Sequence, residues 1–298
     1  MRKRFLLAGV AWLALGASPP LEWTVRGDGV VQGSVGGAPA RIRIDPAAPA
    51  APLVITEVAR RAGLRSGPFD FDYSIGNARI TGKTAVTRID FGLGPTKRRV
   101  GWTDAPYSPG VEGAIGPGLL PPSRIVFQLR SRRAGERSMA LPMVGQGGLE
   151  GRWGERFALI QVGGQPMRVQ FDPQRPRTLA TATAGARIAG AGGGVLSGAT
   201  EPVEIAFGIK RPARTLKLRT PLIVGPLSVP VMAVRTNASG AVGGITDEVA
   251  SPDPDEIVVV GRRSNPGIDQ LRLGRDQLDR CSSIIFDKPA KVIRLSCL

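Results

Sequence analysis

The feature that most constrains the fold of this chain is an internal repeat with a constant offset of 127 residues. Residues 35–46 read VGGAPARIRIDP, and residues 162–173 read VGGQPMRVQFDP. Seven of the twelve positions are identical, namely Val35/Val162, Gly36/Gly163, Gly37/Gly164, Pro39/Pro166, Arg41/Arg168, Asp45/Asp172 and Pro46/Pro173. Self-similarity at a fixed period indicates a duplicated structural unit. We therefore expect a chain built from two similar halves.

Both copies predict the same local structure. Each opens with a Gly-Gly turn and continues as a strand whose alternate residues are apolar. Those apolar residues are Ile42 and Ile44 in the first copy, and Val169 and Phe171 in the second. Each strand then ends at an Asp followed by a Pro, which lacks a backbone donor. The repeat therefore places Asp45 and Asp172 at equivalent points.

The rest of each half also follows one order. Ala-Ile-Gly at 114–116 precedes an apolar strand at 123–127, and Arg-Leu-Gly at 272–274 precedes another at 282–286. Gly and Pro make up 66 of the 298 residues, which favours many short strands joined by turns. We predict a mainly β, two-lobed protein, with an N-terminal lobe at 22–134, a linker at 135–154 and a C-terminal lobe at 155–298.

This order of elements resembles the aspartic proteases of the retropepsin and pepsin type, particularly the bacterial exported ones. The segment LGRDQL at 273–278 is similar to one of the family's motifs, and 285–295 is similar to its closing hairpin. The resemblance covers the chain from about residue 30 onward. It implies a double β-barrel with pseudo-twofold symmetry and short helices. Asp45 and Asp172 would face each other across a cleft that holds an extended polypeptide, and would share one proton and one water.

The chain departs from the family at these two carboxylates. Asp-Pro-Ala at 45–47 and Asp-Pro-Gln at 172–174 replace the Asp-Thr/Ser-Gly triplets. Pro offers neither the hydroxyl nor the N–H that lock the family's two loops together, which argues against efficient hydrolysis. Asp-Pro also commonly starts a turn that the carboxylate caps, so each Asp has a purely structural alternative.

Three functions fit this pattern. The first is binding of an extended polypeptide between the lobes by strand addition, with hydrolysis by Asp45 and Asp172 in doubt. The second is an active aspartic-type endopeptidase, and the third is a non-catalytic cell-envelope interaction protein. The chain has no His and two Cys, which excludes His-dependent nucleophilic sites and four-thiolate metal sites. We expect no cofactor, no metal and a monomer.

A hairpin is expected to turn at Gly76-Asn77. Under the resemblance, this hairpin lies where a flap could cover a substrate, which makes Tyr73 and Gly76 candidate substrate contacts. Packing of Tyr73 in the core or at a sheet edge is an equal alternative.

Residues 1–18 have the pattern of a secretory signal peptide, with three basic residues before a short apolar run. This predicts a periplasmic or secreted protein. Cys281 and Cys297 flank a terminal hairpin centred on Pro289, so we predict a disulfide between them, with two separate apolar thiols as the alternative.

The formal net charge is +16, from 40 basic and 24 acidic residues. Scattered Arg and few aromatic residues speak against nucleic acid as a partner and allow association with an anionic envelope surface. Residues 237–268 have no counterpart in the first half and predict an exposed insertion. Within it, 255–263 resembles the segments that engage the energy-coupling protein TonB, although an ordinary exposed strand is the simpler interpretation.

Overall fold

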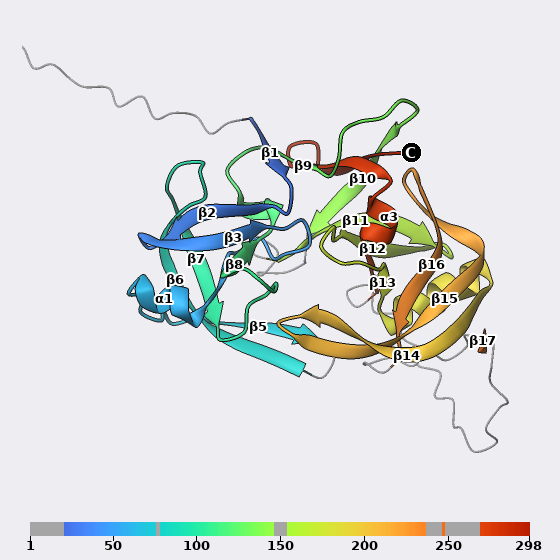
Figure 1. The fold of residues 1–298 in the computed structure, drawn as a ribbon, viewed down its shortest axis with the longest axis horizontal. Helices are drawn as coiled ribbons and strands as arrows, with labels where there is room; N and C mark the ends of the chain where they lie inside the picture. The colour runs from blue at the N-terminus through green and yellow to red at the C-terminus, as the bar shows by residue number, and fades with distance from the viewer. Residues whose placement is uncertain (1–20, 76–77, 146–153, 237–245, 248–268) are drawn as a thin grey trace, which may run out of the picture.

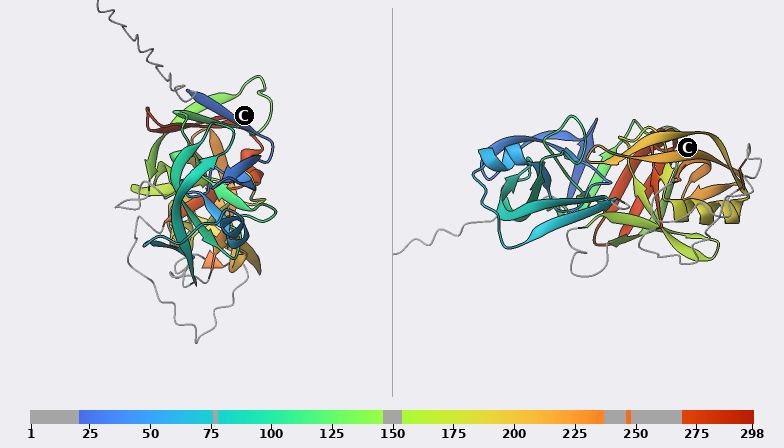
Figure 2. Two further views of the ribbon diagram at one scale, coloured as in Figure 1. Left: turned by 90° about the vertical axis from the view of Figure 1, so that its left-hand side faces the viewer. Right: turned by 90° about the horizontal axis from the view of Figure 1, so that it is seen from below.

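Strands form most of the structure, and those of the repeated hairpins bury alternate residues over part of their length. The computed structural model describes residues 21–75, 78–145, 154–236, 246–247 and 269–298. Most of the strands belong to two large sheets, and the halves of the chain lie side by side along the long axis (Figures 1 and 2). The prediction of a mainly β, two-lobed fold is confirmed.

The elements up to residue 128 are β1 (Glu22–Arg26), β2 (Val30–Val35), β3 (Ala38–Ile44), β4 (Leu53–Ile55), α1 (Thr56–Arg61), β5 (Asp70–Ile75), β6 (Ala78–Asp90), β7 (Thr96–Thr103), β8 (Gly113–Ile115), the 3-10 turn η1 (Pro117–Leu119) and β9 (Arg124–Gln128). Seven of these strands form one sheet in the order β2-β3-β8-β4-β7-β6-β5.

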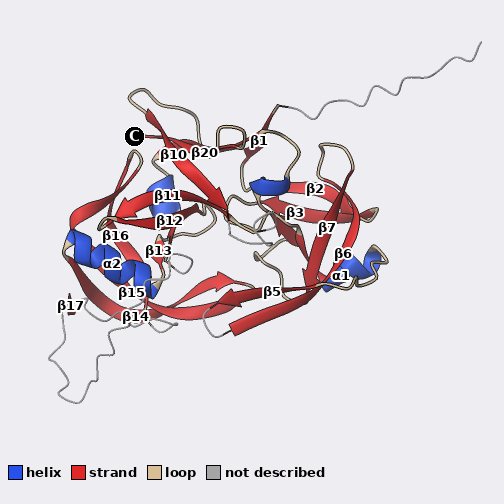
Figure 3. Cartoon of the chain, turned by 180° about the vertical axis from the view of Figure 1, so that it is seen from behind, coloured by secondary structure: helices blue, strands red, loops and turns tan. Residues whose placement is uncertain are grey.

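The later elements are β10 (Arg137–Gly145), β11 (Arg156–Val162), β12 (Gln165–Phe171), β13 (Leu179–Ala180), α2 (Ala182–Gly192), β14 (Gly194–Ala206), β15 (Ile209–Val224), β16 (Leu227–Arg235), β17 (Thr246–Asp247), β18 (Gln270–Leu273), α3 (Arg275–Leu278), β19 (Cys281–Asp287) and β20 (Val292–Cys297). Helices α1 and α2 lie at opposite ends of the molecule (Figure 3).

The repeated sequence forms the same hairpin in both halves. The turn between β2 and β3 has positive φ at Gly36 (58°) and Gly37 (86°), and the turn between β11 and β12 has positive φ at Gly163 (57°) and Gly164 (76°). Two consecutive residues with positive φ suit a two-residue hairpin, and glycine adopts this conformation at low cost.

The second strand of each hairpin then pairs in parallel with the later apolar strand of its own half. Ile44 of β3 lies opposite Ile115 of β8, and Phe171 of β12 lies opposite Leu273 of β18. All four side chains are buried. These are the pairings that a duplicated unit requires, and the pseudo-twofold symmetry itself stays a prediction.

A run of strands joins the two halves. Strands β1 and β9 pair in parallel with each other, and β9 continues through β19 and β20 to β10, which also pairs with β11. Strand β10 occupies part of the segment predicted as a linker, 135–154, and residues 146–153 lie outside the described residues. The division into lobes at this segment stays a prediction.

The predicted disulfide between Cys281 and Cys297 is confirmed. The two residues are direct partners across the β19–β20 hairpin, 16 residues apart in sequence. This bond is compatible with an oxidising, extracytoplasmic location. No helix among the described residues combines the length and the apolar character that crossing a membrane requires. The predicted signal peptide at 1–18 and the segment 255–263 lie outside the described residues, as does all of the insertion at 237–268 except 246–247.

Candidate functional site

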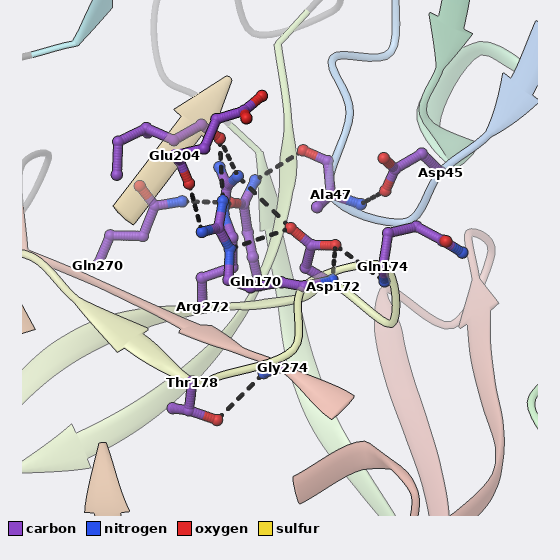
Figure 4. A network of polar contacts seen from close by, with 12 residues as sticks. Asp45, Ala47, Gln170, Asp172, Gln174, Thr178, Glu204, Gln270, Arg272 and Gly274 are labelled. Atoms are coloured by element: carbon purple, nitrogen blue, oxygen red, sulfur yellow. Dashed lines mark hydrogen bonds and ion pairs between the residues drawn. The ribbon is translucent and has the colours of Figure 1, made fainter. Parts of the chain in front are cut away.

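The structure brings Asp45 and Asp172 into one buried site where the two halves meet (Figure 4). The side chains follow β3 and β12, and the two residues are 3% and 7% exposed. Each backbone N–H donates to the strand that pairs with its own: Asp45 to the carbonyl of Ile115 at 2.9 Å, and Asp172 to that of Leu273 at 2.8 Å. The duplicated strands therefore hold the two carboxylates at equivalent points.

Each carboxylate also caps the turn that its own Asp-Pro begins. Oδ1 of Asp45 accepts the N–H of Ala47 at 2.8 Å. Oδ1 of Asp172 accepts the N–H groups of Gln174 and Arg175, both at 3.1 Å. Each Asp is therefore a turn cap, which was the structural alternative for these residues, and is also a member of the buried pair.

Two glutamine side chains form hydrogen bonds between the halves beside the Asp-Pro loops, where the prolines add none. Gln170 Nε2 donates to the carbonyl of Ala47 at 3.3 Å, and Gln174 Nε2 donates to the carbonyl of Asp28 at 3.4 Å. Both bonds join residues of the two sequence halves. The lobes are thus tied together beside the carboxylates by long amide side chains.

Two guanidinium groups compensate the charge of Asp172. Its Oδ2 lies 3.4 Å from Nε of Arg175 and 3.7 Å from Nη1 of Arg272. These three side chains are only about a tenth exposed. A buried carboxylate needs nearby positive charge, and these two guanidinium groups supply it to Asp172.

Arg272 is the centre of a larger buried polar network. Its Nε donates to Oε1 of Gln170 at 3.0 Å, and its Nη2 lies 3.9 Å from Oε1 of Glu155. Burial opposes its charge, but Tyr107, Tyr73, Asp172 and Glu155 outweigh that effect and raise the pKa of Arg272. This guanidinium stays charged and lies between the carboxylates of Asp172 and Glu155.

Asp45 is held differently from Asp172. Burial and the neighbouring charge of Asp172 raise the pKa of Asp45 from 3.8 to about 7, against smaller opposing effects of the Ala47 N–H, Arg272 and Arg43. Two close carboxylates cannot both ionise cheaply. The site therefore holds a proton on Asp45 below neutral pH.

Three aromatic rings pack beside the carboxylates. The ring centroids of Tyr73 and Tyr107 lie 5.3 Å from that of Phe207 and 6.0 Å from each other, all in edge-on contacts. The hydroxyl of Tyr107 donates to the Ala47 carbonyl at 2.9 Å, and that of Tyr73 donates to Glu155 Oε1 at 2.7 Å. This aromatic cluster covers the loop that carries Asp45.

Two hairpins from opposite halves meet at this aromatic cluster. Strands β5 and β6 form one hairpin and β14 and β15 form the other (Figure 1). The N–H of Phe207 donates to the carbonyl of Tyr107 at 3.3 Å, and Arg211 Nη2 donates to the carbonyl of Ile75 at 2.8 Å. The candidate site is thus closed over by both halves.

Tyr73 lies on the predicted hairpin and reaches the site, where it packs in the aromatic cluster. Strands β5 and β6 pair up to Ile75 opposite Ala78, and Gly76 lies outside the described residues. Whether either residue contacts a substrate stays a prediction. No group of three or more Cys, Asp and Glu side chains suited to a metal ion occurs in the part of the chain that the structure describes.

Sequence reasoning missed Arg272, Gln170 and Glu155. A signal for Arg272 was available in the repeat, because Arg272-Leu273-Gly274 stands where the first half has Ala114-Ile115-Gly116. A charged residue at the equivalent of a buried alanine marks a point where the two halves differ in their buried chemistry. Gln170 lies within the repeat, where the first copy has Arg43, and this difference was a further available signal. Glu155 belongs to no motif that would have singled it out.

Comparison with known proteins adds no assignment: no protein-family model matches the chain, and no curated protein matches it significantly in sequence.

The raised pKa of Asp45 predicts a pH-dependent stability. The folded protein keeps a proton that the unfolded chain releases above about pH 4, so folding loses stability as the pH rises to about 7. Asp45→Asn stays neutral and keeps an oxygen acceptor for Ala47. Between pH 4 and pH 8, the urea unfolding free energy of wild type relative to Asp45→Asn should fall by on the order of 3 kcal/mol. Parallel pH curves for the two proteins would refute the buried, protonated Asp45.

The network around Arg272 predicts a large cost for removing its charge. Arg272→Met leaves Asp172 and Glu155 without their shared guanidinium, so we expect a loss of about 3–5 kcal/mol in unfolding free energy. The matched control is Arg177→Met, which removes an exposed pair with Glu201 at 3.2 Å and should cost about 1 kcal/mol or less. Similar losses of unfolding free energy in both variants, measured by urea unfolding at pH 7, would show that Arg272 stabilises the fold no more than an exposed ion pair does.

Proposed function

We propose that this protein binds an extended segment of polypeptide between its two lobes, in an aspartic-protease-like fold. The observation that carries the proposal is that the duplicated carboxylates of Asp45 and Asp172 lie together at the junction of the halves, beneath two hairpins that close over them from either side. The signal-peptide pattern at 1–18 adds the proposal that this binding takes place in the periplasm or outside the cell.

The β5–β6 hairpin offers a sheet edge to which an extended peptide could add. Strand β5 is at the end of its sheet and pairs with β6 alone among the described strands. Such an edge presents unpaired N–H and C=O groups to which an extended chain can add as a further strand. Main-chain hydrogen bonds then provide affinity without demanding one particular peptide sequence.

The state of Asp172 favours binding over hydrolysis. Its Oδ1 accepts two backbone N–H groups, and its Oδ2 faces Arg175 and Arg272. A carboxylate engaged on both oxygens is poorly placed to take a proton from water, because a general base must reach that proton directly. The prolines that follow both Asp residues also argue against hydrolysis, since they add no contact between the two loops.

A second candidate is an aspartic-type endopeptidase, which the raised pKa of Asp45 favours. In that reaction Asp172 would accept a proton from a bound water as the oxygen adds to the peptide carbonyl, and Asp45 would donate its proton to the carbonyl oxygen. The two residues would exchange these roles as the amine leaves with a proton.

The closed hairpins predict that loosening them strengthens binding. Phe207→Ala removes the ring that contacts both Tyr73 and Tyr107, so a peptide would no longer need to displace it. We expect tighter binding of a fluorescently labelled, reduced and carboxymethylated casein, by about threefold to tenfold in anisotropy titrations. Phe69→Ala is the control, because Phe69 is 60% exposed and lies outside the aromatic cluster.

The proposal fails if neither wild type nor Phe207→Ala binds the unfolded polypeptide. The same polypeptide, incubated from pH 3 to pH 7 and followed by mass spectrometry, separates binding from hydrolysis. Cleavage by wild type that Asp45→Asn abolishes would establish the endopeptidase instead. Equal background in both proteins would leave binding as the function.

A further inference from the structure

A row of side chains lies along the outer face of the N-terminal sheet. Val86 and Arg88 of β6 stand directly opposite Arg99 and Lys97 of β7, and alternate residues of a strand share one face. The residues between them face the other way, and Val100 among them is buried in the core. Because β2 also pairs with β6, the sheet closes on itself, and the row lies on its convex outer side.

Two apolar side chains are exposed on this face. Phe69 is 60% exposed and Val86 is 50% exposed. The guanidinium carbon of Arg99 lies 5.0 Å from the centre of the Phe69 ring, and its Nη1 donates to Oγ1 of Thr84 at 2.8 Å. A cation over an aromatic ring holds that ring in place, here on the face that carries Val86. We call this set the outer strip, and it consists of Phe69, Val86, Arg88, Lys97 and Arg99.

The outer strip carries two cations that have no anionic partner. Arg88 and Lys97 are exposed, and neither side chain has a hydrogen bond or an ion pair among the residues that the structure describes. Like charges directly opposite each other in a sheet oppose folding. The next residue of β6 on this face is Asp90, which instead accepts the N–H of Gly92 at 2.9 Å. The outer strip therefore gains from an anion supplied by a partner.

We propose that the outer strip docks on the anionic surface of a phospholipid membrane. Cations beside exposed apolar side chains match the boundary between charged headgroups and acyl chains. The convex outer side of a closed sheet suits a broad surface rather than a narrow chain. The formal net charge of +16 adds a long-range attraction to the same surface.

The outer strip extends away from the candidate functional site. Tyr73 lies opposite Ile80, and Arg88 is eight residues further along β6, which corresponds to about 27 Å. Docking of the outer strip on a membrane would therefore leave the carboxylate pair at a distance from the lipid. This inference does not depend on the proposed function, because it concerns where the protein is held and not what it binds between its lobes.

Cosedimentation with vesicles tests the proposal. Vesicles of phosphatidylcholine with about one third phosphatidylglycerol should bind wild type at about 0.1 M NaCl and release it at about 0.5 M, because salt screens the attraction. Arg88→Gln/Lys97→Gln removes both unpaired cations and should lower the partition coefficient about thirtyfold. Phe69→Ala should lower it about threefold to tenfold, because less apolar surface enters the headgroup region. Vesicles of phosphatidylcholine alone should bind none of the proteins appreciably.

The matched control is Arg132→Gln/Arg133→Gln, which removes the same charge from the exposed loop between β9 and β10. It should lower the partition coefficient by about threefold or less, through the net charge alone. An equal loss in both double variants would overturn the proposal, since binding would then follow net charge and not the outer strip. All variants contain residues 1–18, so binding through that segment would appear as equal partitioning of every protein and would also overturn it.

Urea unfolding separates a lost contact from a lost fold. Arg88→Gln/Lys97→Gln should unfold at the same urea concentration as wild type or a higher one, because it removes the repulsion between two opposite cations. Soluble polyglutamate offers negative charge without an apolar interior. Binding of polyglutamate as tight as that of the vesicles, unchanged in Phe69→Ala, would identify an acidic polypeptide as the partner and refute the membrane.

Discussion

The arrangement at the lobe junction depends on how the charge of Asp172 is balanced. Two carboxylates buried together would repel each other and oppose folding, because burial and like charge both penalise ionisation. Arg175 and Arg272 compensate Asp172, and Asp45 retains its proton up to about pH 7. With Asp172 beside two guanidinium groups and Asp45 neutral below about pH 7, the two loops can meet without two uncompensated negative charges.

The same arginines connect the carboxylates to the rest of the junction. Arg272 reaches Glu155, whose carboxylate accepts the Tyr73 hydroxyl from the β5–β6 hairpin. Tyr73 in turn contacts Phe207 at the tip of the hairpin from the other half. A change at the buried charges would therefore reach both hairpins, which under the proposed function are the elements that a bound polypeptide would move.

Sequence reasoning found what repetition and local pairing determine. The repeat located Asp45 and Asp172, and hairpin symmetry located the bond between Cys281 and Cys297. The sequence did not reveal the buried partners of these carboxylates that distant elements contribute. Arg272 alternates with Leu271 and Leu273, which is the pattern of a strand with an exposed charged face. Its burial comes from β14 and from the loop after Asp172, and no local pattern encodes that packing.

The central claim is that Asp45 and Asp172 form one coupled buried pair, and a carboxyl titration tests it most directly. Carbon-13 NMR of selectively labelled aspartate, with Asp45 assigned by its loss in Asp45→Asn, should show that carboxyl titrating near pH 7. Asp172→Asn should lower this pKa, because the neighbouring negative charge is removed. Titration of Asp45 near pH 4, unchanged by Asp172→Asn, would contradict the account.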